Sequence, residues 1–285
     1  MRFLIPFSVF CACTGSSYNQ GAITPTGDDT ADTADTNDTD TGTNPDTGDT
    51  GEPEVCTNMW HPIHESGWSK TFTATYEDTQ GTATEEGLGA NKTPSGLPVY
   101  QYRDAISNTN DEGYNVIVSV ACDLDGQEGM FMVEWAGEYN YTLFEFFPMN
   151  VQVTSILTPP RKYLSPEWAL DAGGAEGSWE YAYELMIIQE SDGKQPEPLP
   201  TQVTGTYYDA GTQQITLFDG TEVTAYKLTN DFLLVNDIQT LEGHIEQYWV
   251  KGLGMVREVF EDQTAGTELL TKELSGYSGL SIIED

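Results

Sequence analysis

The stretch that decides the fold is Tyr114-Asn115-Val116-Ile117-Val118-Ser119-Val120, which is followed after a gap by Met130-Phe131-Met132-Val133-Glu134-Trp135. Both runs are rich in β-branched, aromatic and other apolar residues, a composition typical of strands. Between them lie Asp125-Gly126 and Glu128-Gly129, and glycine takes up the positive φ angles that tight turns need. The two runs therefore predict an antiparallel hairpin.

Alternating, strand-like segments continue toward the C-terminus. We expect strands at residues 141–147, 151–157, 178–188, 203–208, 214–218, 222–228, 244–250, 255–261 and 268–275. Asp219-Gly220 and the segment 251–254 (Lys-Gly-Leu-Gly) should form hairpin turns. Residues 232–235 fit either a strand or one apolar turn of a helix.

Prolines and glycines interrupt this pattern in the middle of the chain. Pro159-Pro160 and Gly173-Gly174 indicate an irregular stretch, and Ser165-Pro166-Glu167 is a helix-start signal for a short helix around residues 167–170. Residues 190–200 hold three prolines and are a candidate sub-boundary. The predicted fold is all-β: an antiparallel, strongly curved sheet or half-barrel with room for one short helix.

The charge balance restricts the partners. The 285-residue chain has 46 acidic and 11 basic residues, a formal net charge of −35. Such a surface repels phosphate backbones and anionic lipid headgroups, so we expect no nucleic-acid partner. It suits a cation or a basic protein.

The N-terminus predicts export and lipid anchoring. Residues 1–12 place one positive charge before a short apolar run, which is typical of a signal peptide and shorter than the about 20 residues of a membrane span. Ala12-Cys13 resembles the end of a bacterial lipobox, although Phe10 and Cys11 depart from the usual residues. We therefore predict lipidation of Cys13, with an ordinary secretory peptide as the alternative.

A low-complexity spacer follows the predicted anchor. Residues 13–54 are rich in Asp, Thr and Gly and contain no Lys or Arg, so little can be buried and like charges extend the chain. We predict a disordered tether here and one globular domain at residues 55–285. Such tethers behind a lipobox resemble those of envelope lipoproteins of myxobacteria, which implies a membrane-anchored protein of the bacterial envelope. We expect the outer membrane, with the domain facing the periplasm or the cell surface.

The cysteines then leave one pair in the domain. Cys11 would leave with the signal peptide and Cys13 would carry lipid, so Cys56 and Cys122 remain. Exported proteins fold where disulfides form, so this pair predicts a disulfide. Two separate buried thiols are the alternative.

The C-terminal third carries a resemblance. The segment Gln247–Glu258 joins an aromatic strand, a Gly-x-Gly turn and a charged strand. Over residues 200–277 it is similar to hairpins of uncharacterised bacterial lipoproteins, and these resemble the curved half-barrels of the periplasmic lipoprotein carriers. The resemblance implies a concave sheet that holds an acyl chain and supplies no catalytic residues.

The sequence offers little catalytic chemistry. It has no Gly-x-Ser-x-Gly motif, and Pro62 prevents His61 and His64 from sitting on one helix like the histidine pair of zinc proteases. His61 and His64 remain candidate zinc ligands if a distant third residue joins them, but a capped loop explains them as well. We therefore expect no enzyme, no metal and no cofactor.

Aromatic residues are frequent on the expected strands. Core packing explains most of them, but an apolar cleft for a ligand would use the same residues. The candidate ligand-binding residues are Tyr183, Tyr207, Tyr248 and Trp249. The sequence thus favours a non-catalytic lipoprotein that binds a hydrophobic ligand or an envelope partner. The alternative is a structural or display lipoprotein without a small ligand, which predicts a packed interior in place of a roomy cavity.

Overall fold

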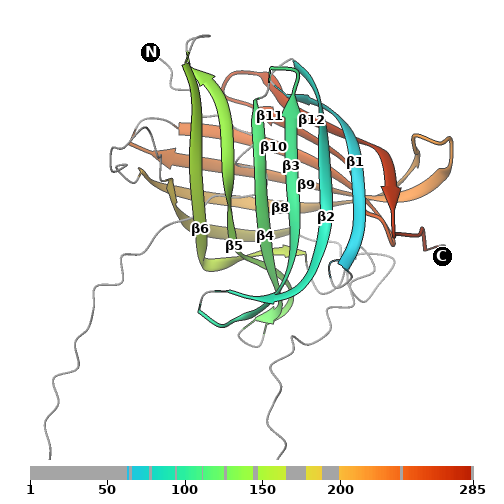
Figure 1. The fold of residues 1–285 in the computed structure, drawn as a ribbon. Coiled ribbons are helices and arrows are strands. Elements are labelled where there is room, and N and C mark those ends of the chain that lie inside the picture. Colours follow the sequence, from blue (N-terminus) through green and yellow to red (C-terminus); the bar gives the residue numbers. More distant parts are fainter. Residues whose placement is uncertain are drawn as a thin grey trace, which may run out of the picture.

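The chain forms one antiparallel sheet that closes into a barrel (Figure 1). This computed structural model describes residues 63, 66–76, 79–93, 95–110, 112–124, 127–143, 147–164, 178–187, 199–237 and 240–283. The strands are β1 Ser66–Tyr76, β2 Thr79–Lys92, β3 Pro98–Asn108, β4 Gly113–Leu124, β5 Gln127–Leu143, β6 Phe147–Leu164, β7 Ser178–Ile187, β8 Leu199–Thr216, β9 Glu222–Asn236, β10 Thr240–Val250, β11 Gly254–Asp262 and β12 Thr267–Ser278.

Each strand pairs with its neighbour in the sequence, and β12 returns to pair with β1. Figure 1 shows β2–β6 as one wall of the barrel, with β8–β10 crossing behind it at a steep angle. This up-and-down order confirms the predicted all-β antiparallel class. The sheet curves further than the expected half-barrel and closes on itself.

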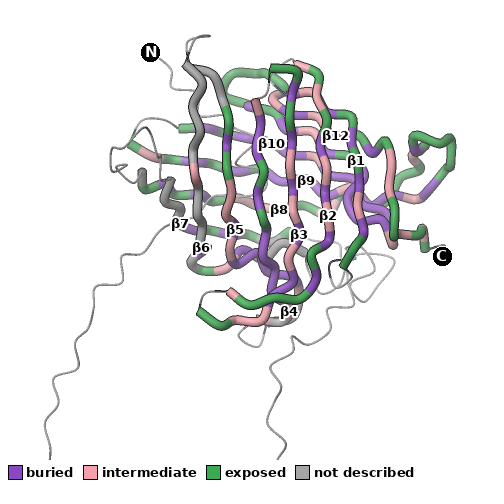
Figure 2. The backbone as a smooth tube through the Cα atoms, in the orientation of Figure 1, coloured by how far each residue is buried: buried purple, intermediate pink, exposed green. Residues whose placement is uncertain are grey.

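Inward and outward positions alternate along most strands (Figure 2). In β1, for example, Trp68, Lys70, Phe72, Ala74 and Tyr76 are buried, whereas the residues between them are exposed or half-buried. Closure removes the free edges that an open sheet would leave for aggregation.

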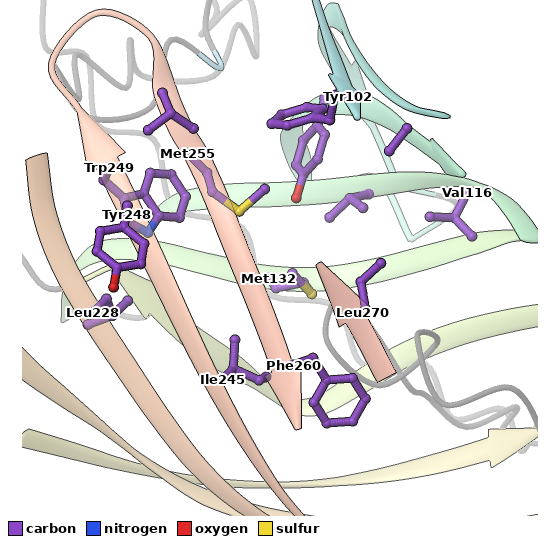
Figure 3. Close-up of a cluster of buried hydrophobic side chains, with 14 of the residues drawn as sticks. Tyr102, Val116, Met132, Leu228, Ile245, Tyr248, Trp249, Met255, Phe260 and Leu270 are labelled. Carbon is purple, nitrogen blue, oxygen red and sulfur yellow. The ribbon is translucent and has the colours of Figure 1, made fainter. Parts of the chain in front are cut away.

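Large side chains fill the barrel interior. Figure 3 shows Leu228, Ile245, Phe260 and Leu270 from one wall, together with Tyr102, Val116 and Met132 from β3–β5. All belong to a single hydrophobic cluster that spans the interior. The largest fully buried side chains include Trp68, Trp135, Trp249, Tyr76 and Tyr226.

Glycines make room for several of these aromatic rings. A Cβ at Gly87 would overlap the Trp68 indole, and one at Gly243 would overlap the Phe232 ring. Each ring therefore lies flat against the backbone of the next strand, where any larger residue would displace it.

The turns follow the sequence signals. Asp219-Gly220 forms the β8–β9 turn, with Gly220 at a φ of 87° and Thr221 N donating to Asp219 Oδ1 over 3.0 Å. At the β10–β11 turn, Gly252 and Gly254 each have a φ of 79°. The C-terminal segment packs against this turn, and Ile283 N donates to the Lys251 carbonyl oxygen over 3.1 Å.

The seam between β6 and β7 is the thinnest in the barrel. Among the described residues this ladder holds one residue pair, Thr158 with Glu184, whereas the neighbouring ladders hold ten or more. Strand β6 contains Pro148 and the Pro159-Pro160 pair, and proline cannot donate to a ladder. The irregular stretch expected at Pro159-Pro160 does not end the strand: β6 continues through both prolines, but its pairing with β5 shifts register there, between Arg161 and Ile156.

Candidate functional site

The outer wall carries a groove of about 700 Å³ across β7–β10. Its lining is Glu180, Tyr181, Ala182, Thr204, Gly205, Thr206, Asp231, Phe232, Leu233, Glu242, Gly243 and Gln263. Three of these residues bring carboxylates, and Leu233 adds an aliphatic side chain that is 38% exposed. The groove therefore combines negative charge at its walls with an apolar surface.

The turn between β11 and β12 closes one end of the groove. Gln263 N donates to the Glu242 carbonyl oxygen and Glu242 N donates to Thr264 Oγ1, both over 2.9 Å. These bonds hold the turn against β10, so this end of the groove has a defined shape.

A histidine borders the groove. His244 Nδ1 lies 2.6 Å from Asp231 Oδ1, and its Nε2 lies 3.8 Å from Glu246 Oε1. Lys227 Nζ lies 2.5 Å from the same Glu246 oxygen. Each of these side chains contacts an oppositely charged or hydrogen-bonding neighbour. The contacts order the outer face of β9 and β10, and none of these groups stands out as a nucleophile.

A second polar site lies inside the barrel. Lys70 Nζ lies 2.5 Å from Glu85 Oε2 and donates to the Met255 carbonyl oxygen over 3.0 Å. Lys272 Nζ lies 3.0 Å from both carboxylate oxygens of Asp104. These charged side chains are almost fully buried, and buried charges persist only when they are paired.

A third carboxyl group completes this interior cluster. Glu258 on β11 pairs with Lys272 of β12 in the strand ladder and accepts a 2.5 Å hydrogen bond from Gln247 Nε2. Burial raises the pKa of Glu258; Lys272 and the Gln247 bond lower it in part, while Asp104 and Glu85 raise it. For Lys272, burial lowers the pKa, but the attraction of Asp104, Glu258 and Glu85 outweighs it and the net direction is upward.

The neighbouring amide fits a protonated Glu258. Gln247 Oε1 is buried and makes no hydrogen bond among the described residues. A neutral carboxylic acid can donate its O–H to this oxygen while accepting from the amide nitrogen, so both groups would be satisfied.

Glu258 should make stability depend on pH. A raised folded-state pKa means that the folded chain holds the proton where the unfolded chain has lost it. The free energy of unfolding should therefore fall as pH rises from the ordinary carboxyl value of 4.5 through the raised pKa, by about 1.4 kcal/mol per unit of separation. Urea unfolding across this range should show a smaller decline for Glu258→Gln. If the free energies of unfolding of the wild type and Glu258→Gln differ by the same amount at every pH, Glu258 is not the group responsible. The control is Glu222→Gln at an exposed position.

Two of the predicted ligand-binding tyrosines lie close together inside the barrel. Tyr183 and Tyr207 each have their ring about 5.9 Å from the Arg161 guanidinium carbon, and Tyr181 stands 5.5 Å from it. Tyr181 O–H also donates to Asn230 Oδ1 over 3.1 Å. This buried cation–π cluster spans β6, β7 and β8, so it bridges the thin seam.

Tyr248 and Trp249 lie elsewhere. The Tyr248 ring stands between Lys227 at 5.6 Å and Arg257 at 5.4 Å, and its O–H donates to Glu246 over 3.2 Å. Trp249 is 1% exposed and belongs to the hydrophobic cluster. The structure thus separates the four candidates into two groups, and neither group lines the outer groove.

Several predicted sites fall outside the described residues. These are Cys13, Cys56, His61, His64 and the short helix at residues 167–170. Cys122 is disulfide-bonded. The pairing with Cys56 remains a prediction.

The described part of the chain contains no cluster of three or more His, Cys, Asp or Glu side chains arranged to hold a metal ion. Within the same residues, no helix has the length and hydropathy needed to cross a membrane.

Comparisons with known proteins give only architectural likeness. No family model matches the chain, and no curated protein matches it. A candidate lipoprotein of Parabacteroides distasonis has a TM-score of 0.46 at 11% identity, over 79% of this chain and all of that one. A candidate exported protein of Bacteroides fragilis, described as having a YmcC-like fold, has a TM-score of 0.38 at 10% identity, over 78% of this chain and all of that one. Likeness at this level carries no argument about function.

Proposed function

We propose that this chain is a non-catalytic envelope lipoprotein, anchored through Cys13, whose barrel binds a basic segment of an envelope partner in the groove on β7–β10. The observation that carries the proposal is the groove itself, where Glu180, Asp231 and Glu242 surround an exposed leucine. A cationic segment with apolar side chains complements both features, and complementary charge speeds and orients association.

Packing of the described side chains inside the barrel favours binding on the outer face. A hydrophobic ligand would need apolar space within the barrel, and the described interior is occupied by aromatic rings and paired charges. The same packing favours a second candidate, a structural or display lipoprotein that binds no ligand.

A short cationic peptide tests the groove. An acetylated, amidated (Lys-Leu)₃ peptide should shift backbone amide resonances of β7–β10 in the mature protein. The variant Glu180→Gln/Glu242→Gln should bind about fivefold more weakly, because each exposed charge contributes about 0.5 kcal/mol. Affinity should also fall with added salt.

The matched control is Glu138→Gln/Glu222→Gln, which removes the same charge at exposed positions outside the groove. If both variants bind the peptide equally weakly, the loss of affinity is due to net charge alone. That result would reject the groove as the binding site. Absence of binding to the wild type would favour the display role. An acyl species that co-purifies in native mass spectrometry would instead support a hydrophobic ligand.

A further inference from the structure

The ion pair between Lys272 and Asp104 joins strands that are not neighbours. Lys272 lies on β12 and Asp104 on β3, with β1 and β2 between them. In the ladder Lys272 pairs with Ala74, whose small side chain leaves space inside the barrel for the lysine to cross. Nζ reaches 3.0 Å from each Asp104 oxygen, so amine and carboxyl group are already in contact.

The surroundings of this pair suit a reaction between them. The two side chains are 2% and 6% exposed, which excludes bulk water. Tyr114 O–H donates to Asp104 Oδ2 over 3.0 Å, and its ring lies 5.4 Å from Lys272 Nζ. Glu258 lies opposite Lys272 in the β11–β12 ladder, and its buried carboxyl group interacts electrostatically with that lysine.

We propose that Lys272 and Asp104 condense after folding into an intramolecular amide between Lys272 Nζ and Asp104 Cγ, which joins β12 covalently to β3. The Lys272 ammonium first passes one proton to the Asp104 carboxylate, giving an amine and a carboxylic acid. The amine attacks Cγ, and Tyr114 O–H bonds to the developing oxyanion. Neutral Glu258 protonates the departing hydroxyl and takes one proton from the nitrogen. The products are the amide, one water molecule and an unchanged Glu258.

Burial and proximity favour this product. Condensation replaces two buried charges by one neutral amide, which removes the cost of keeping two ions away from water. Holding the groups in contact gives effective concentrations of about 10⁵ M or more, which offsets the usual preference for hydrolysis in water. Because the charged pair is itself stable, the first proton transfer should be slow. A slow reaction is sufficient, since the amide needs to form only once in each chain.

The neighbouring ion pair provides an internal comparison. Lys70 Nζ also contacts Glu85, but it donates in addition to the Met255 carbonyl oxygen. That bond directs one N–H of Lys70 away from the Glu85 carboxylate and holds Nζ in place. We therefore expect one condensation per chain, and it should involve Lys272.

Intact mass spectrometry of the reduced, denatured mature protein tests the proposal. The wild type should be one water molecule lighter than expected from the mass of Lys272→Arg, after allowance for the lysine-to-arginine difference. The arginine keeps the charge but cannot form this amide, and comparing the two cancels any shared lipid modification. Trypsin should fail to cleave after residue 272, and the digest should contain a branched peptide that joins segments of β3 and β12. Glu258→Gln should leave most of the protein unreacted.

Three results would overturn the proposal. The first is a wild type at its full mass. The second is a water loss that persists in Lys272→Arg, which would indicate a cyclic imide at Asp104. The third is a branched peptide that contains Lys70. The wild-type spectrum decides the matter even if a variant fails to fold.

Discussion

Replacing Lys70 by Met is expected to destabilise the barrel by about 3–5 kcal/mol, because it leaves the Glu85 carboxylate buried without its partner. The Met255 carbonyl oxygen also loses its donor. The double variant Lys70→Met/Glu85→Met should recover most of this loss, since an apolar pair needs no compensating charge. Urea unfolding of both single variants and the double variant gives the coupling energy directly.

Glu86 follows Glu85 on β2 and points to the opposite face of that strand, so its ion pair is a matched control. Glu86 pairs with Arg103 at 2.9 Å, but these side chains are 46% and 42% exposed. Arg103→Met should therefore cost less than about 1 kcal/mol. If Lys70→Met and Arg103→Met lower the free energy of unfolding by the same amount, the Lys70–Glu85 pair is hydrated. Its assignment as a buried charge pair would then be wrong.

Replacing Gly137 by Ala is expected to lower the free energy of unfolding by about 3 kcal/mol. A Cβ at this position on β5 would overlap the Asn115 carbonyl oxygen and lie 2.6 Å from Val116 Cα. Both are backbone atoms of β4, so a side-chain rotation cannot relieve the clash and the β4–β5 ladder must separate locally. Thermal and urea unfolding should both show the loss.

Gly276→Ala on β12 is the comparison, because no atom lies within 4 Å of the Cβ it would add. Its stability should change by less than about 0.5 kcal/mol. A similar loss in both variants would mean that β5 can shift away from β4, and the close strand approach would not be a constraint on the sequence.

Turn chemistry and alternation predict much of this fold. The Asp219-Gly220 turn and the strands on either side were expected, as was the Gly-rich turn of Gln247–Glu258. Residues 232–235 resolve as part of β9. The segments 203–208 and 214–218 proved to be one strand, β8, because an irregularity between Asp209 and Thr212 bends it without ending it.

The first three strands were not predicted. Strand β1 alternates well, but Lys70 occupies an inward position where the sequence suggests a solvated side chain. Strand β2 is rich in Gly and Glu, and its inward positions include Gly87, which is needed beneath the Trp68 ring. Small and charged inward residues hide the apolar period on which sequence reasoning depends.

The interior polar cluster was missed for the same reason. Its members come from strands far apart in the sequence, and nothing local marks Asp104 or Lys272 as buried. The outer groove combines residues of β7, β8, β9 and β10, so it exists only once the strands are in register. The aromatic candidates were found from composition, and composition alone does not say which rings share a site.

The pairing of β1 with β12 also determines when the barrel can finish folding. Ser69 lies opposite Ser278, so this ladder joins segments separated by almost the whole domain. Every other ladder joins consecutive strands and can form as a local hairpin, whereas this one must overcome the loop-closure entropy of the entire chain. During synthesis, the β1 edge therefore exposes unpaired backbone N–H and C=O groups until β12 has been made. Truncation before Thr267 removes β12 and should yield an open sheet that aggregates. The C-terminal strand therefore keeps the protein soluble by closing the barrel.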